Sequence, residues 1–296
     1  MTSHQKPPEA TKGADPCQHP ADARNGQEVV ETGKCGALMP RPYASGKRWT
    51  LYRADALEVL AALPDASVDG LVTDPPYSSG GSFRGDRTGD VTVKYLSTGS
   101  KQAEYLPQFA GDNRDQRAFG YWSALWLGEA LRVVRPGRAA VLFTDWRQLP
   151  TTTDALQAGG WVWRGIAPWC KTNSRPQLGR FAAAAEFAVW GTAGPSADDP
   201  QIGCLKGYAV AMPPSNREHV TQKPVDVMDW LVGIVPAEGV VLDPFAGSGT
   251  TGVAALASGR SFVGVERTVE NADVCARRLE QAENDGQQLA MFGGAA

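Results

Sequence analysis

The sequence predicts an α/β fold built on a mainly parallel sheet. Short apolar runs of strand length alternate along the chain with longer stretches in which apolar residues recur at helical spacing. Two of the runs, Val68–Thr73 and Ala139–Phe143, are typical of strands buried on both faces of a parallel sheet. The chain has 296 residues, of which 42% are hydrophobic, so a sizeable core is expected.

The predicted elements are bounded by local signals. The predicted strands are Trp49–Arg53, Val68–Thr73, Ala139–Phe143, Trp161–Trp169, Glu186–Trp190, Val240–Leu242 and Phe262–Val265. The predicted helices are Ala56–Leu63, Phe119–Val134, Leu149–Ala158, Pro224–Val235, Thr250–Ser258 and Val269–Glu283. Pro136–Gly137 and Gly159–Gly160 stop the two helices before them, and Pro224 suits the first turn of a helix.

The regular pattern predicts one domain at 47–283 between two tails. Residues 1–46 are rich in proline, glycine and polar residues and lack periodicity, which predicts a disordered tail, and 284–296 is expected to be a flexible tail. Residues 78–117 interrupt the pattern with many glycines and charges, which indicates a mobile loop of functional importance. Residues 191–218 are also loop-like.

Composition excludes several classes of protein. The net charge of −3 argues against a purely electrostatic nucleic-acid binder. No apolar stretch approaches the ~18 residues of a membrane span, and the first residues lack the apolar core of a secretory signal. Five scattered cysteines favour a reducing cytoplasm. His4, Cys17, His19 and Cys35 offer zinc-type ligands, but their spacing fits no common finger, so no metal is expected.

A glycine-rich turn follows one predicted strand, in the sequence VVLDPFAGSGTTG at 240–252. Gly247, Gly249 and Gly252 satisfy the spacing of a dinucleotide-binding turn, and Glu266 follows Gly247 by 19 residues. NAD is one reading of this motif, and a purely structural turn is another. Asp243 would repel a pyrophosphate but attract the ammonium and sulfonium of S-adenosylmethionine, whose ribose hydroxyls Glu266 would bind.

A second apolar strand ends in Asp74-Pro75-Pro76-Tyr77. The prolines remove backbone donors, which leaves the carbonyl groups of Asp74 and Pro75 as acceptors. The Asp74 side chain and the Pro75 carbonyl would each accept an N–H from an exocyclic amine, while Tyr77 stacks on the ring that carries it. The alternative is a strand end followed by a rigid turn.

The two motifs, in this order, resemble the beta group of DNA amino-methyltransferases. The similar stretches are LYRADALEVLAALPDASVDGLVTDPPY at 51–77, RVVRPGRAAVLFTDWRQLP at 132–150 and HVTQKPVDVMDWLVGIVPAEGVVLDPFAGSGTTGVAALASGRSFVGVER at 219–267. The resemblance implies a Rossmann-like S-adenosylmethionine-dependent methyltransferase fold, circularly permuted, with about seven strands, one of them antiparallel. Phe262–Val265, Val240–Leu242, Val68–Thr73 and Ala139–Phe143 would lie centrally. Ala54 and Val220 depart from the glycine and proline usual there.

The resemblance also assigns residues to roles. The implied catalytic residues are Asp74, Pro75, Pro76 and Tyr77. The implied cofactor-binding residues are Asp55, Ala56, Thr73, Thr221, Gln222, Lys223, Asp243, Pro244, Phe245, Ala246, Gly247, Ser248, Gly249, Thr250, Thr251, Glu266 and Arg267. Asp55 would contact the adenine of the cofactor, Lys223 its carboxylate and Phe245 its sulfonium.

The implied reaction is methyl transfer to adenine N6 of a base flipped out of double-stranded DNA. Cytosine N4, RNA, a protein glutamine amide and a non-catalytic DNA- or clamp-binding protein stay open as alternatives. Arg164, Lys171, Arg175 and Arg180, interleaved with aromatic residues, form the candidate DNA-binding groove; the alternative is a strand pair with solvated charges. Residues 78–117 would order on DNA, and 172–218 would read a short target site.

The last residues offer a possible partner site. Gln288-Leu289-Ala290-Met291-Phe292 resembles the short peptides that dock in the replication sliding clamp; the contacts would come from Gln288, Leu289, Met291 and Phe292. The alternative is an ordinary tail. The expected setting is the nucleoid in the cytoplasm of a bacterial or phage-infected cell, and the protein is expected to be a monomer or a homodimer.

Overall fold

The computed structural model describes residues 39–77, 114–174, 178–179, 181–196, 199–213 and 223–292, with side chains as far as residue 286. The chain divides into two compact units, Met1–Val30 and Glu31–Ala296, and every described residue belongs to the second. The possible zinc ligands His4, Cys17, His19 and Cys35 lie outside the described residues, as do 78–113 of the predicted loop.

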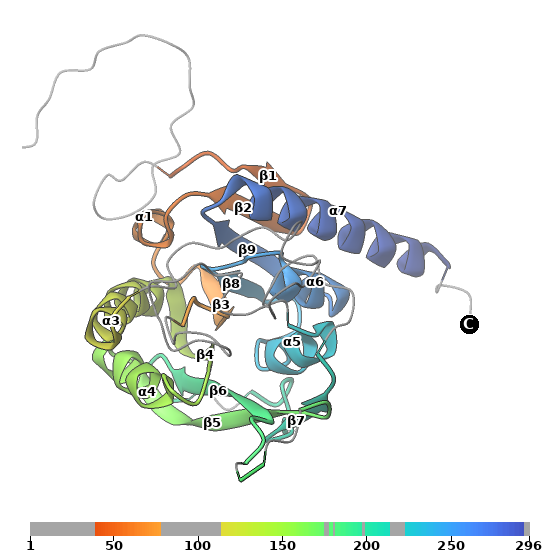
Figure 1. Ribbon diagram of the computed structural model, residues 1–296. Helices are drawn as coiled ribbons and strands as arrows, with labels where there is room; N and C mark the ends of the chain where they lie inside the picture. Colours follow the sequence, from red (N-terminus) through yellow and green to blue (C-terminus); the bar gives the residue numbers. More distant parts are fainter. Residues whose placement is uncertain are drawn as a thin grey trace, which may run out of the picture. The chain divides into compact units, whose positions relative to one another are not determined.

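The described residues form one nine-stranded sheet in the order β1-β2-β9-β8-β3-β4-β6-β5-β7 (Figure 1). The strands are β1 (Ala44–Ser45), β2 (Trp49–Arg53), β3 (Val68–Thr73), β4 (Val134–Thr144), β5 (Val162–Lys171), β6 (Ala185–Thr192), β7 (Ala209–Ala211), β8 (Val240–Asp243) and β9 (Ser261–Glu266). All neighbours are parallel except β1 with β2 and β6 with both β4 and β5.

Helices cover both faces of the sheet. They are α1 (Ala56–Ala62), α3 (Gln116–Val133), α4 (Leu149–Ala158), α5 (Val225–Val232), α6 (Thr250–Ala257) and α7 (Val269–Phe292). Helices α1, α3 and α4 pack together on one face and α5, α6 and α7 on the other (Figure 1). Successive side chains of the central strands point to opposite faces of the sheet. Leu71 and Leu142 belong to the hydrophobic cluster under α1, α3 and α4, and Val72 and Phe143 belong to the cluster under α5, α6 and α7.

The implied seven-strand core is confirmed. It is the series β2-β9-β8-β3-β4-β6-β5, in which β6 is the antiparallel strand. The strands β8 and β9 come late in the chain but lie between β2 and β3, as a circularly permuted order requires. The predicted central strands are those found at the centre. No described helix is long and apolar enough to cross a membrane.

Several predicted boundaries were wrong. Helix α3 begins at Gln116, inside the loop predicted at 78–117, and β4 begins at Val134, so Pro136–Gly137 lie within a strand. Strand β1 falls inside the tail predicted at 1–46, where the Tyr43 N–H donates to the Leu51 carbonyl. Strand β7 falls in the segment predicted as loop, because so short a strand carries no readable period. Helix α7 continues past Glu283 to Phe292, into the tail predicted as flexible, although Asn284, Asp285 and Gly286 are weak helix formers; the run from Gln287 to Met291 that follows them favours a helix.

This topology concentrates strand ends that are far apart in sequence. Strands β2, β9, β8, β3 and β4 run in one direction, so their carboxyl ends share one edge of the sheet. After β8 the chain enters α6 on one face, whereas the chain after β3 leads to α3 on the other. The carboxyl ends of β8 and β3 therefore flank a topological switch point, where ligands bind in open α/β sheets.

Candidate active site

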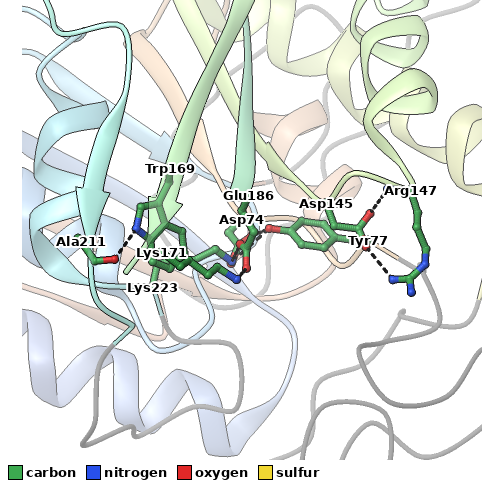
Figure 2. A network of polar contacts seen from close by, with 9 residues as sticks. All are labelled: Asp74, Tyr77, Asp145, Arg147, Trp169, Lys171, Glu186, Ala211 and Lys223. Carbon is green, nitrogen blue, oxygen red and sulfur yellow. Dashed lines mark hydrogen bonds and ion pairs between the residues drawn. The ribbon is translucent and has the colours of Figure 1, made fainter. Parts of the chain in front are cut away.

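Asp74 lies directly after β3 and accepts hydrogen bonds from two side chains (Figure 2). The Tyr77 hydroxyl donates to Oδ1 of Asp74, and Nζ of Lys223 donates to Oδ2 at 2.5 Å. Lys223 also donates to the Tyr77 hydroxyl oxygen at 3.1 Å. Its ammonium lies 4.9 Å from the centre of the Phe143 ring. The predicted catalytic residues Asp74 and Tyr77 are thus brought together with Lys223.

A second pair of charges extends this cluster. Glu186, at the start of β6, is in ion-pair contact with Lys171 of β5, and its Oε2 lies 3.5 Å from Nζ of Lys223. Ammonium and carboxylate groups therefore alternate from Lys171 through Glu186 and Lys223 to Asp74. The ammonium of Lys223 is nearly closed to water, since its side chain is only 7% exposed, whereas the other three side chains are partly buried.

The pKa values follow from burial and these neighbours. Burial raises the pKa of Asp74, and the ammonium of Lys223 offsets this only in part. Burial would also raise the pKa of Glu186, but Lys223 and Lys171 hold it below its usual value. Burial and the carboxylate of Asp74 raise the pKa of Tyr77 well above its usual value, with further contributions from Glu186 and Asp145. Tyr77 is therefore a neutral hydrogen-bond donor at neutral pH.

The glycine-rich turn after β8 is held by close packing. Gly249, the N-cap of α6, has a φ of +80°, and a Cβ there would lie 2.7 Å from Sγ of Cys275. At Gly252 a Cβ would lie 2.4 Å from the Leu279 side chain, so glycine lets α6 pack closely against α7 and β9. Burial raises the pKa of the Cys275 thiol, consistent with a structural cysteine.

Asp243 is engaged from within the protein. Its Oδ1 accepts from the Thr73 hydroxyl at 2.6 Å and from the Phe245 N–H at 3.0 Å, and its Oδ2 accepts from the Thr251 hydroxyl at 2.6 Å. Burial raises its pKa to about 6. The sequence predicted that Asp243 would face a cationic cofactor. In the structure, three protein donors use most of its roughly four acceptor sites.

The strand ends beside this turn carry two further carboxylates. Asp55 follows β2, is exposed, and accepts from the Leu57 N–H at 3.0 Å as the N-cap of α1. Glu266 ends β9 and accepts from the Gly247 N–H at 3.1 Å and from the Thr268 hydroxyl at 2.7 Å. Their strands are paired, since Arg53 is in register with Glu266. These two carboxylate acceptors fit the adenine and ribose of S-adenosylmethionine, both of which carry hydrogen-bond donors.

The other implied cofactor residues are divided between core and surface. Ala56, Pro244, Ala246, Ser248, Thr250 and Thr251 are buried, and Arg267 is exposed. Thr221 and Gln222 lie outside the described residues. The ring of Phe245 packs 5.3 Å from Trp122 and 5.1 Å from Trp126. Sequence reasoning missed this aromatic wall and the guanidinium of Arg114, 4.1 Å from Trp122, although Trp122 and Trp126 are one helical turn apart.

The four basic residues predicted to bind DNA do not form one group among the described residues. Arg164 and Lys171 lie near opposite ends of β5, and Arg164 donates to the Thr192 hydroxyl. Lys171 lies at the edge of the sheet where Asp74 follows β3, and it is paired with Glu186. Arg175 and Arg180 fall outside the described residues. Trp161 and Trp169 belong to the core, which favours the alternative reading of this strand pair for those aromatics.

The structure tests neither the metal nor the clamp prediction fully. Among the described residues, no cluster of His, Cys, Asp or Glu could hold a metal ion. Gln288, Leu289, Met291 and Phe292 continue helix α7, and their side chains lie beyond those described.

Comparisons with known proteins find similar DNA methylases. A sequence profile of the N6/N4 DNA methylase family matches residues 68–277. The chain is 30% identical over 241 residues to YubD of Escherichia coli (strain K12), covering 80% of this chain and 93% of the relative. It is 25% identical over 272 residues to the type II methyltransferase M2.DpnII of Streptococcus pneumoniae, and this match covers 84% of this chain and 96% of that protein. The crystal structure of the M1.HpyAVI–SAM complex is similar with a TM-score of 0.54 and 25% identity. The match covers 78% of this chain and 98% of that chain.

Proposed function

This chain belongs to the N6/N4 DNA methylase family, and from that premise we propose that it methylates N6 of adenine in double-stranded DNA. The observation that carries the proposal is the partly buried cluster of Asp74, Tyr77 and Lys223, which adjoins the glycine-rich turn at the switch point of the sheet. The enzyme is a methyltransferase that uses S-adenosylmethionine.

The cofactor supplies a methyl group bonded to a positively charged sulfur. We assign its adenosine part to Asp55 and Glu266, and its methionine part to the turn from Gly247 to Gly249 and the start of α6. Lys223, Thr221 and Gln222 are proposed to complete the site. The aromatic wall that includes Phe245 would border it on the α3 side.

Asp74 is proposed to hold the amine of the target base. Its carboxylate accepts one amine N–H and the Pro75 carbonyl another, which directs the nitrogen lone pair away from the ring. As the N–C bond forms and the S–C bond breaks, the amine loses a proton to Asp74 or to solvent. The raised pKa of Asp74 makes it a better proton acceptor than an ordinary aspartate. Tyr77 is proposed to stack on the base, which must leave the duplex to reach this depth.

Adenine is the proposed base because an aspartate stands first in the Asp74–Tyr77 motif, as in the adenine-specific proteins that the motif resembles. Cytosine N4 is the second candidate, because its amine fits the same acceptors and the family profile covers both reactions. Residues 78–117 are proposed to order on DNA and residues 172–218 to read its sequence, with basic contacts from Arg164, Lys171, Arg175 and Arg180. We place this activity at the nucleoid in the cytoplasm, in a monomer or a homodimer.

A clamp contact through Gln288, Leu289, Met291 and Phe292 is a further part of the proposal. It would let methylation follow replication. Deletion of 287–296 is expected to abolish capture of the protein by an immobilised sliding clamp and to leave methylation of short DNA unchanged. Unchanged capture would refute the clamp contact alone.

The test of the function is a product assay. Purified protein, methyl-labelled S-adenosylmethionine and unmethylated genomic DNA are incubated, the DNA is digested to nucleosides, and the labelled nucleoside is identified by mass spectrometry. We expect N6-methyladenine with the native protein and at least about 100-fold less in the same time with Asp74→Ala. Labelled N4-methylcytosine would replace adenine by cytosine and keep the site. No label in DNA would refute DNA as the substrate.

A further inference from the structure

Glu186 is a partly buried carboxylate of the candidate active site that belongs to neither motif. Its neighbour Phe187 is in register with Thr144 at the end of β4, which places Glu186 at the catalytic edge of the sheet. One carboxylate oxygen, Oε1, accepts from Lys171 (Figure 2). The other, Oε2, is buried and has no hydrogen bond among the described residues, although Lys223 lies 3.5 Å away.

Lys223 stands between two carboxylates that compete for its charge. Its Nζ is 2.5 Å from Oδ2 of Asp74 and 3.5 Å from Oε2 of Glu186. The amine of a target base needs the same Asp74 oxygens that now accept from Lys223 and Tyr77. Access to Asp74 therefore depends on how strongly Lys223 is attracted elsewhere, and for an ammonium as buried as that of Lys223 the nearest opposite charge has a large effect.

We propose that Glu186 is a positioning residue for methyl transfer, which acts by drawing the Lys223 ammonium away from Asp74 so that Asp74 can accept the amine of the base. This inference rests on the proposed function, in which Asp74 holds that amine. Lys171 fixes Glu186 for this task by holding Oε1, which leaves Oε2 directed at Lys223.

The charges around Asp74 make the role measurable by pH. Facing Asp74 are Lys223, Tyr77 and, from β6, Glu186, with Asp243 at the end of the neighbouring strand β8. Lys223 lowers the pKa of Asp74 and Glu186 raises it. Without the charge of Glu186, Lys223 has Asp74 as its remaining carboxylate partner in the cluster. Both effects lower the pKa of Asp74.

The first experiment is Glu186→Gln in the full-length chain. We expect kcat at neutral pH to fall by about 10- to 100-fold, the usual effect of a displaced reacting group. The acidic limb of the kcat profile should move to lower pH, and the dissociation constant of S-adenosylmethionine, from calorimetry, should stay within about threefold. Glu129→Gln is the matched control, because it removes a carboxylate of α3 that is paired with Arg132 at 3.2 Å outside the active site; both kcat and its pH profile should be unchanged.

A double variant separates positioning from stability. Glu186→Gln leaves the charge of Lys171 without its partner, whereas Lys171→Met with Glu186→Gln restores the charge balance. We expect the double variant to regain the native melting temperature but to keep the low kcat of the Glu186→Gln enzyme. Lys171→Met alone is the reference for any effect of Lys171 on DNA binding. This design also serves if Glu186→Gln does not fold.

Several results would overturn the inference. The first is that kcat and the acidic limb of its pH profile are unchanged in Glu186→Gln. The second is that kcat recovers together with stability in the double variant. The third is that Glu186→Gln lowers only the affinity for the cofactor. If the native protein methylates DNA and any one of these three results is obtained, Glu186 has a structural role and the proposed function stands. If the native protein methylates no DNA, the proposed function itself fails.

Discussion

Asp74 and Asp243 follow or end two neighbouring parallel strands, β3 and β8, and each precedes a proline. Asp243 is buried and Asp74 is partly buried, and burial raises the pKa of both carboxyl groups. They differ in their partners. Two threonine hydroxyls and one backbone N–H hold Asp243, whereas the ammonium of Lys223 and the hydroxyl of Tyr77 hold Asp74.

The comparison shows that partners, and not the Asp-Pro sequence, decide what a strand-end carboxylate does. The donors of Asp243 come from β3, the turn and α6, so this carboxylate ties three elements together. The donors of Asp74 include a charge that a second carboxylate, Glu186, also attracts. Asp243 is therefore suited to hold the site in shape, and Asp74 to exchange partners.

The largest expected difference between the two is in turnover. Asp74→Ala should lower kcat by about 10²–10³-fold, as the loss of one preorganised polar contact to the reacting group does. Asp243→Asn keeps an oxygen for Thr73 and Phe245, so its loss in kcat should be smaller. Initial rates of methyl transfer at saturating cofactor and DNA measure both. Equal losses in the two variants would break the division of roles.

The next largest effect is on stability. Asp243→Ala leaves two buried hydroxyls and one N–H without their acceptor, at about 1–3 kcal/mol for each group that finds no other. We expect the free energy of unfolding to fall by about 3 kcal/mol or more, and by less in Asp74→Ala, where Glu186 still pairs with Lys223. Urea denaturation followed by circular dichroism tests this. A larger loss in Asp74→Ala would reverse the comparison.

The third effect is the pH dependence of stability. The pKa of Asp243 is about 6 in the folded protein, against a usual 3.8. The native state thus binds the proton more tightly than the unfolded chain. Its contribution is fully present below pH 3.8 and is lost as pH rises through about 6, amounting to at most about 3 kcal/mol.

Asp243→Asn cannot release this proton, so it should lack that part of the pH dependence. Urea denaturation of both proteins between pH 4 and 7 gives the difference as a function of pH. Identical curves for the two would contradict the assigned pKa.

The smallest effect is expected at the side chain that links the two carboxylates. Thr73 precedes Asp74 and donates its hydroxyl to Asp243. Thr73→Val should lower the free energy of unfolding by about 1 kcal/mol, the value of one buried hydrogen bond, with a loss in kcat well below that of Asp74→Ala. A loss of kcat as large as in Asp74→Ala would show that the two sites act as one.

Strong local patterns carried the prediction of the fold. Val68–Thr73 and Leu149–Ala158 were predicted at their observed bounds, since each has a clear apolar pattern and a stop signal. Strands β1 and β7 were missed because pairing with neighbours, and not their own two or three residues, defines them.

The candidate site was predictable where it lies within motifs. Asp74 and Tyr77 were predicted to act together, whereas Lys223 was predicted to meet the carboxylate of the cofactor. Its contact with Asp74 spans 149 positions and depends on how α5 approaches the sheet. Glu186 was interpreted as one acidic charge among basic residues. Only the pairing of β6 with β4 and β5 brings it to Lys171 and Lys223.

The permuted strand order has a consequence for biosynthesis. A ribosome releases β2 and β3 early, yet the two strands that separate them, β9 and β8, belong to the last part of the chain. Until that part emerges, β2 and β3 each expose an unpaired edge at the future centre of the sheet, a state prone to association with other chains. A premature stop before Val240 would therefore remove the middle of the sheet and leave two fragments that cannot close against each other.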